Sequence, residues 1–78
     1  MSQFPRITFD PQVMGGKPCI RGMRVTVGMI VSSIANNALP DDLLRDYPYL
    51  EREDIRQALA YAAQLVDGEQ IVPFAKAS

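Results

Sequence analysis

The stretch "GGKPCIRGMRVTV" (residues 15–27) passes from a loop of glycines and cations into an alternating run of β-branched residues, and it sets the fold of the first part of the chain. Its first ten residues hold three glycines, one proline and three cations. The segment 23–27 alternates like a strand, and so does "RITF" (6–9), which stops at the turn-forming pair Asp10-Pro11. We expect these two segments to be short strands that pair with each other, and we expect the glycines to allow a tight loop between them.

A pair of strands alone is marginally stable in water, so this pair must lie against helices or against a second copy of the chain. The same loop resembles a phosphate-binding loop, which requires G-x-x-x-x-G-K-[ST] between a strand and a helix. Pro18 stands where that motif needs Ser or Thr, Pro11 stands where it needs its first glycine, and a strand follows. The sequence therefore excludes this class of nucleotide site.

After residue 26 the apolar spacing changes from that of a strand to that of a helix. The segment 27–37 carries apolar residues at helical spacing along one face. Thr26 is a suitable N-cap, and Asn37 is the residue best able to take a left-handed conformation at the other end. The face consists of Val27, Ile30, Val31, Ile34 and Ala35.

Two further helices follow. Pro40 suits the first turn of a short helix over 40–47, which Pro48 stops. The segment 51–66 predicts the longest helix, which we expect to end at Asp67-Gly68. The sequence thus predicts a mainly α fold, a three-helix, helix–turn–helix-like bundle preceded by two short β-strands. The buried face of the long helix is predicted to comprise Ile55, Ala58, Leu59, Ala62, Leu65 and Val66.

Length and composition narrow the classes of function. Seventy-eight residues allow one domain, predicted over 1–68, followed by a tail (69–78) whose apolar residues either fold back on the core or bind a partner. One cysteine and no histidine exclude an internal disulfide framework and a zinc site built on Cys19. We find no nucleophile–base pair, and the dipole accounts for the acidic residues at helix starts, so we expect no enzyme, no metal and no cofactor. Without an apolar run long enough to cross a bilayer or a secretory signal, a cytoplasmic location is expected.

The net charge of −1 hides an asymmetry along the chain. Residues 1–39 hold four cations and one carboxylate, a charge of +3, whereas residues 40–78 hold four cations and eight carboxylates, a charge of −4. Such a division suggests two faces that meet different partners.

Two helix pairs could form the helix–turn–helix, namely 27–37 with 40–47 or 40–47 with 51–66, and the sequence leaves both open. Glu51, Glu53 and Asp54 in the first turn of the long helix would repel a duplex, so the loop cations are the better phosphate contacts. Alternatively, Lys17 or Arg24 ties the loop to Asp10 or to a helix end. The candidate DNA-binding residues are Lys17, Arg21, Arg24, Arg52, Arg56 and Gln57.

Two segments, "ITFDPQVMGGKPCIRGMRVTV" (7–27) and "IANNALPDDLLRDYPYLEREDIRQALAYAA" (34–63), resemble the DUF433 family of small bacterial and archaeal proteins. Three positions depart from the family pattern: Met23 replaces a threonine, Asn37 a helix-ending glycine, and Glu51 a Ser or Thr cap. The matching positions are Asp10, Pro11, Gly16, Lys17, Pro18, Ile20, Gly22, Arg24, Val25, Val27, Tyr47, Pro48, Leu50, Glu53, Asp54 and Ile55.

The resemblance implies a helix–turn–helix-like antitoxin of the VapB type, paired with a toxin that resembles a PIN-domain ribonuclease. Such an antitoxin is expected to neutralise its toxin and to repress its own operon as a homodimer bound to operator DNA. One alternative is a protein-interaction module without DNA binding, which the acidic pI of 5.1 favours. Another is a stand-alone transcriptional repressor. The tail residues expected to bind the toxin are Ile71, Val72, Phe74 and Lys76.

Overall fold

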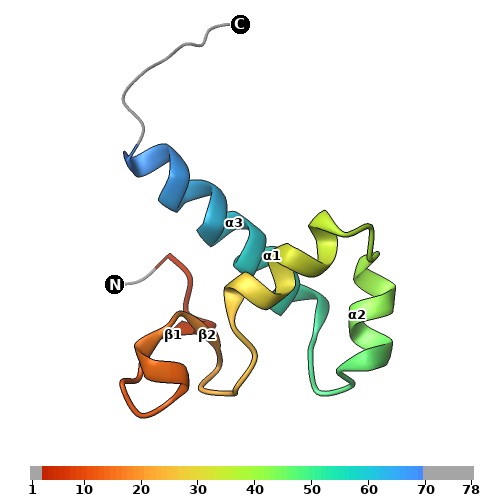
Figure 1. Cartoon of the computed structure of the whole chain (residues 1–78), viewed down its shortest axis with the longest axis horizontal. Coiled ribbons are helices and arrows are strands. Elements are labelled where there is room, and N and C mark those ends of the chain that lie inside the picture. Colours follow the sequence, from red (N-terminus) through yellow and green to blue (C-terminus); the bar gives the residue numbers. More distant parts are fainter. Residues whose placement is uncertain (1–2, 70–78) are drawn as a thin grey trace, which may run out of the picture.

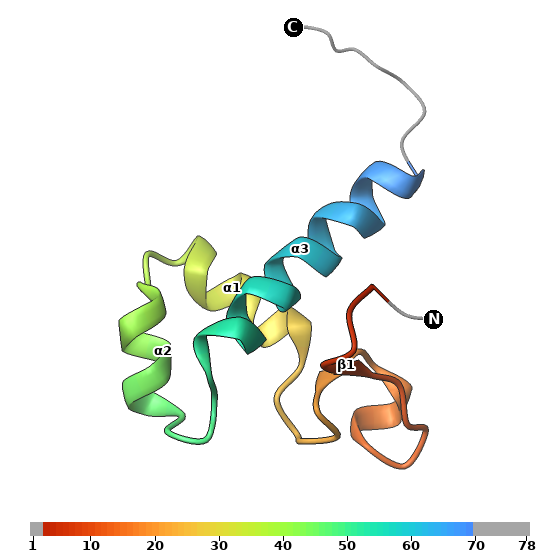
Figure 2. The same cartoon turned by 180° about the vertical axis from the view of Figure 1, so that it is seen from behind.

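The structure of the protein, a computed structural model, describes residues 3–69. A hairpin of two short strands, β1 (Ile7–Thr8) and β2 (Cys19–Ile20), precedes three helices, α1 (Val27–Ala35), α2 (Pro40–Asp46) and α3 (Arg52–Glu69). A single 3-10 turn, Met14–Gly16, lies in the loop between the strands. Figures 1 and 2 show α1 crossing α3, with the hairpin on one side of this pair and α2 on the other. The predicted fold class, mainly α with a minor β component, is confirmed.

The hairpin differs from the prediction in its second strand. The two strands are antiparallel, with Ile7 opposite Ile20, and the predicted second strand at 23–27 is wrong. The chain reverses at Arg21 and Gly22, which have φ of 47° and 74°, the left-handed values of tight hairpin turns. Residues 25–27 therefore return alongside residues 18–20: Ile20 N donates to Val25 O at 2.9 Å, and Val27 N donates to Pro18 O at 2.9 Å.

Helix α1 begins at Val27 as the sequence predicts, and it ends at Ala35, two residues before the predicted end at Asn37. The two residues predicted to terminate it, Thr26 and Asn37, have the predicted conformations. The Thr26 hydroxyl accepts a hydrogen bond from the Met29 backbone N–H at 3.0 Å, which caps the first turn. At the other end Asn37 has φ of 75°, and Ala38 N donates to Ser33 O at 3.0 Å, a Schellman motif. Both end residues were predicted correctly.

Helix α2 agrees with its prediction, but α3 does not end where expected. It continues through Asp67 and Gly68 to Glu69, because one glycine near a helix end costs only about 1 kcal/mol relative to alanine. Leu65 and Val66 were predicted to be buried and are instead 50% and 66% exposed. The last turns of α3 extend beyond the other helices, so no element among residues 3–69 covers them (Figures 1 and 2). No helix in residues 3–69 is long and apolar enough to cross a membrane.

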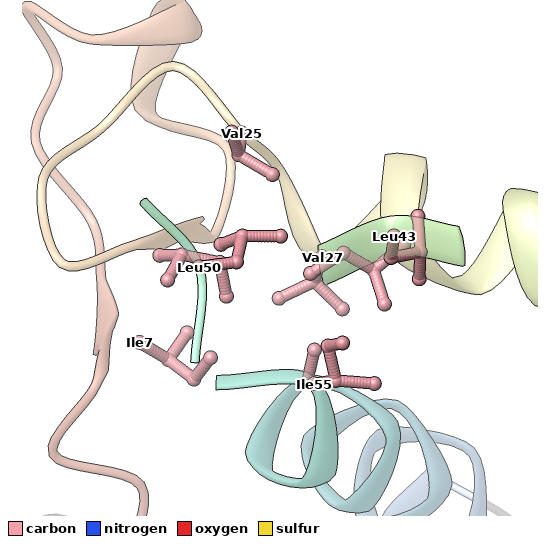
Figure 3. Close-up of a cluster of buried hydrophobic side chains, with 9 residues drawn as sticks. Ile7, Val25, Val27, Leu43, Leu50 and Ile55 are labelled. Carbon is pink, nitrogen blue, oxygen red and sulfur yellow. The ribbon is translucent and has the colours of Figure 1, made fainter. Parts of the chain in front are cut away.

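The core lies where the hairpin, α1, α2 and the first half of α3 meet. Each of these elements contributes aliphatic side chains to one cluster, and Figure 3 shows the side chains of Ile7, Leu50 and Ile55 directed toward those of Val27 and Leu43. Burial of these groups is the main favourable term for a domain of this size. The buried members are Ile7, Ile20, Val25, Val27, Ile30, Leu43, Leu50, Ile55 and Ala58.

Candidate functional site

A buried carboxylate joins the hairpin to the start of α3. The side chain of Asp54 is 0% exposed, and Arg21 binds it in a bidentate manner, with Nε to Oδ1 at 3.0 Å and Nη2 to Oδ2 at 2.8 Å. Arg6 donates from Nη1 to Oδ1 at 3.0 Å, and the Glu51 backbone N–H donates to Oδ2 at 2.8 Å. Asp54 is the third residue of α3, so this last bond is half of a capping box. The carboxylate thus has four donors, which compensates its removal from water.

The pKa of Asp54 reports this balance. Burial alone would raise the pKa of the carboxyl group, but hydrogen bonds from Arg21, from the Glu51 backbone and from Arg6 outweigh it, so the pKa lies below its usual value. Asp54 therefore stays ionised at neutral pH. The arginines respond in the opposite direction: hydrogen bonding to Glu51 and Asp54 raises the pKa of Arg6.

Arg6 and Gln57 extend the junction along α3. Arg6 Nη1 donates to Glu51 Oε1 at 2.7 Å, and the Arg6 backbone N–H donates to Gln57 Oε1 at 3.1 Å. Gln57 is buried and donates in turn to Glu53 Oε2 at 2.9 Å. Arg21 also donates from Nη2 to Tyr49 O at 2.9 Å. Two predicted DNA contacts, Arg21 and Gln57, are thus engaged inside the protein, where they hold the hairpin on α3.

Arg52 and Arg56 lie on the outer face of α3, and each has an acidic partner. Arg52 binds Asp41 of α2, and Arg56 binds Glu53 through two bonds, at 2.9 Å and 2.6 Å. The hydrogen bonds from Arg56 and then Gln57 lower the pKa of Glu53 to about 2. Both guanidinium groups are exposed, but their charges are compensated by neighbouring carboxylates.

Lys17 and Arg24 are the two remaining candidate cations: Lys17 lies in the loop between β1 and β2, and Arg24 lies between β2 and α1. Both are exposed, and within residues 3–69 neither forms an ion pair. Arg24 Nη1 lies 3.8 Å from the sulfur of Met14 in the 3-10 turn. Asp10, the partner considered for them, instead accepts a hydrogen bond from the Gln12 backbone at 2.9 Å. We considered an ion pair between Lys17 or Arg24 and Asp10 or a helix end. The structure has such an ion pair between Arg21 and Asp54 of α3 instead.

An open apolar groove of about 790 Å³ lies between α1 and the second half of α3. Met29 is 38% exposed beside it, and Leu65 and Val66 expose half or more of their surface. Tyr61 closes one side and packs edge-on against Phe4 and Phe9, with ring centroids 5.7 Å and 5.9 Å away. Exposed apolar surface of this kind is typical of interaction sites. The lining residues are Lys17, Pro18, Thr26, Val27, Gly28, Met29, Val31, Ser32, Ser33, Tyr47, Tyr61, Ala62, Leu65 and Val66.

Comparison with known proteins agrees with the motifs of the hairpin and α3. A family model described as "Protein of unknown function (DUF433)" matches residues 7–62. The chain belongs to the DUF433 family. "Uncharacterized protein y4eO" of Sinorhizobium fredii (strain NBRC 101917 / NGR234) is 38% identical over 56 residues, which are 72% of this chain and 25% of that protein. The chain thus spans about a quarter of the length of this curated relative. No solved structure matches the chain described by this sequence.

Residues that match the DUF433 pattern lie on both sides of the junction around Asp54. On the side of the hairpin lie Ile20 and the turn residue Gly22, and on the side of α3 lie Leu50, Asp54 and the buried Ile55. The match to the family ends at residue 62, within α3. The exposed residues Leu65 and Val66 therefore lie beyond the DUF433 match.

The structure places the predicted DNA-binding residues in two regions. Lys17 and Arg24 lie before and after β2, while Arg21, Arg52, Arg56 and Gln57 surround the first turns of α3. The four predicted toxin contacts, Ile71, Val72, Phe74 and Lys76, lie outside the described residues 3–69. Sequence reasoning missed Asp54 as the centre of the junction and missed Arg6 altogether. The available signal was the spacing of three residues between Glu51 and Asp54, which is that of a capping box.

Proposed function

We propose that this DUF433 protein is the antitoxin of a type II toxin–antitoxin pair, which binds and neutralises a PIN-like ribonuclease toxin. The observation that supports it most is the uncovered apolar surface where α3 leaves the body, with Leu65 and Val66 beside Met29. This surface leads directly into the tail for which toxin contacts are predicted, Ile71, Val72, Phe74 and Lys76. A protein partner suits the groove because it is open and mainly apolar, whereas small-molecule sites enclose most of their ligand.

Operator binding by a homodimer is the second part of the proposal. It relies on Lys17 and Arg24, which are exposed and without ion pairs within residues 3–69. Phosphate neutralisation supplies most of the non-specific affinity of DNA-binding proteins, and a dimer would bring four such cations to one duplex. Arg52 and Arg56 would contribute less, because Asp41 and Glu53 compensate their charges.

A protein-interaction module without DNA binding is the second candidate. It is favoured by the engagement of four predicted DNA contacts within the protein. Arg21, Arg52 and Arg56 each bind a carboxylate, and Gln57 is buried.

The toxin-binding part is tested by co-expressing the full chain with the protein encoded beside it. In the double variant L65D/V66D we expect neutralisation of ribonuclease activity to fall, since each half-exposed aliphatic side chain contributes about 1 kcal/mol when buried by a partner. The control variant is Leu39→Asp, because Leu39 is 63% exposed at the start of α2 and lies outside the groove. This variant should neutralise the ribonuclease activity as well as the wild type does. Equal neutralisation by all three proteins would refute a role of this surface.

The DNA-binding part is tested by a mobility shift on the DNA upstream of the gene. Binding by the wild type should fall steeply with salt, and the K17A/R24A variant should bind more weakly with a smaller salt slope. R52A/R56A is the matched control, since it removes the same number of cations from the other face. No shift at low salt, with the toxin present, would favour the interaction module.

A further inference from the structure

Met29 completes the N-terminal cap of α1 with its sulfur atom. The Thr26 backbone N–H donates to Met29 Sδ, with 3.5 Å between nitrogen and sulfur, and the Met29 backbone N–H donates to the Thr26 hydroxyl at 3.0 Å. This reciprocal pair is a capping box, in which a Glu or Gln with a side-chain oxygen ordinarily takes the place of Met29. Because sulfur is a weak acceptor, Met29 holds the Thr26 N–H less firmly than such an oxygen would.

The Met29 side chain also lines the open groove between α1 and α3. It is 38% exposed, which makes it the most exposed methionine of residues 3–69. Met14 is half-buried, and its sulfur accepts a hydrogen bond from Arg24 Nη1 at 3.8 Å. Met23 is half-buried too and packs against the hydrophobic core. Met29 is therefore the methionine of this part of the chain that a small oxidant reaches most readily.

We propose that Met29 is a site of reversible oxidation by hydroperoxides, and that its sulfoxide preserves the cap of α1 while it makes the groove polar. In the reaction a lone pair of Sδ attacks the outer oxygen of the hydroperoxide, so that an S–O bond forms as the O–O bond breaks. The proton of the transferred hydroxyl passes to the leaving oxygen. Sulfur is oxidised by two electrons, and the hydroperoxide is reduced to water or an alcohol. Methionine sulfoxide reductases reverse the modification.

The sulfoxide suits the cap because its oxygen is a stronger acceptor than sulfur. It can accept the Thr26 N–H as the oxygen of Glu or Gln does at this position of a capping box. The groove changes in the opposite sense, since a polar S–O group then stands in the surface that Leu65 and Val66 also line. A partner that covers Met29 with apolar atoms must strip water from the remaining lone pairs of this oxygen, which weakens binding. The weaker binding rests on the proposed function, whereas the oxidation of Met29 and the retention of the cap do not.

Peroxide treatment of the full chain, followed by peptide mass mapping, tests the site. Cleavage after arginine places Met14, Met23 and Met29 in separate peptides. We expect a mass increase of one oxygen atom in the peptide of Met29 before the other two, with no fall in the urea midpoint, and reversal by the reductases.

Two variants separate the cap from the groove. Met29→Gln supplies a permanent side-chain oxygen and should have a urea midpoint no lower than that of the wild type. Met29→Leu offers neither a sulfur nor an acceptor, so its midpoint should be lower by about 0.5 M and should not respond to peroxide. After the peroxide has been removed, oxidised wild type and untreated Met29→Gln should both bind the toxin about tenfold more weakly than the untreated wild type. Met29→Leu keeps an apolar groove and should bind like the wild type.

Each other outcome overturns the inference or one of its parts. Oxidation of Met14 or Met23 before Met29 would refute the site. A lower midpoint of the oxidised wild type would show that the sulfoxide breaks the cap. Unchanged toxin binding by Met29→Gln, under conditions in which L65D/V66D loses it, would refute the effect on the groove. If L65D/V66D also neutralises the toxin like the wild type, the proposed toxin surface is refuted together with the effect of oxidation on binding, but the mass and urea measurements still decide the oxidation of Met29 and the cap.

Discussion

Replacing Asp54 with asparagine tests whether the buried junction holds the hairpin on α3. Asparagine keeps the size and one carbonyl acceptor but removes the charge and the second carboxylate oxygen. Its amide hydrogens would face the Arg21 guanidinium or the Glu51 backbone N–H, both of which donate to Asp54 in the wild type. The change therefore leaves at least one of these donors without the acceptor that it has in the wild type.

The loss can be worked from the geometry. Removing one partner of a buried ion pair costs about 3–5 kcal/mol. The lower end applies, because the side chains of Arg6 and Arg21 remain 29% and 37% exposed and regain water when the carboxylate is gone. We expect Asp54→Asn to destabilise the protein by about 3 kcal/mol. A domain of 78 residues has a free energy of unfolding of about 4–12 kcal/mol, so about a quarter to three quarters of its stability would be lost.

Urea unfolding followed by far-UV circular dichroism measures this loss. With a slope of about 1 kcal/mol per molar urea, the midpoint should fall by about 3 M. Asp41→Asn is the matched control, since it also removes one negative charge from an arginine, but at an exposed pair in which little stability is expected. Hydrogen exchange should quicken first at the amides of Ile7 and Ile20, because the hairpin loses its anchor before the helices separate.

The reasoning would be refuted by a midpoint for Asp54→Asn that equals that of Asp41→Asn. In that case the aliphatic core alone would hold the hairpin, and the four hydrogen bonds to Asp54 would be no stronger than those that the same groups make with water. Faster exchange spread evenly over the hairpin and helices, with a lower midpoint, would show that the junction stabilises the fold without anchoring the hairpin specifically.

Three further predictions concern acid stability and two backbone positions. The pKa of Asp54 and that of Glu53, about 2, are lower in the folded than in the unfolded protein. Their stabilisation is thus complete above about pH 5 and is lost as the pH falls through the unfolded and then the folded pKa values; urea midpoints between pH 7 and pH 2 should fall accordingly, and less so in Glu53→Gln. Asn37→Gly should raise the melting temperature, since φ at Asn37 is 75° and glycine relieves about 1 kcal/mol of left-handed strain, partly offset by the freer unfolded chain. Gly22→Ala should cost about 1–2 kcal/mol of unfolding free energy, because φ is 74° there although the space around it is open; Gly28→Ala in α1 is the control and should cost nothing.

Periodicity predicted the helices because it records which side chains share a face. The spacing that begins at Val27, the cap at Thr26 and the left-handed residue at Asn37 are all local features, and the structure has all three. The same periodicity could not tell whether a face is covered. It placed Leu65 and Val66 on the buried side of the long helix, but both are half or more exposed and line an open groove.

The strand and the candidate site were harder to predict because both depend on contacts between distant residues. Alternation at 23–27 identified extended backbone, but the left-handed pair at Arg21 and Gly22 decided that this segment returns alongside β2. Residue type made Arg21 a candidate for DNA, since an arginine beside a loop glycine is commonly exposed. Its carboxylate partner lies 33 residues away at Asp54, a distance that no local pattern reports.

The position of Lys17 links the two parts of the proposed function. Lys17 lines the rim of the groove between α1 and α3, and it is also one of the two loop cations without an ion pair in residues 3–69. A partner that fills the groove as far as this rim would meet the same ammonium group that phosphate contact requires. If that partner is acidic at the rim, it lowers the affinity for DNA, and by thermodynamic linkage DNA lowers the affinity for the partner by the same factor. Toxin binding and operator binding would then be coupled through one side chain, and neutralisation of the toxin and repression of the operon would respond to each other without any change in the fold.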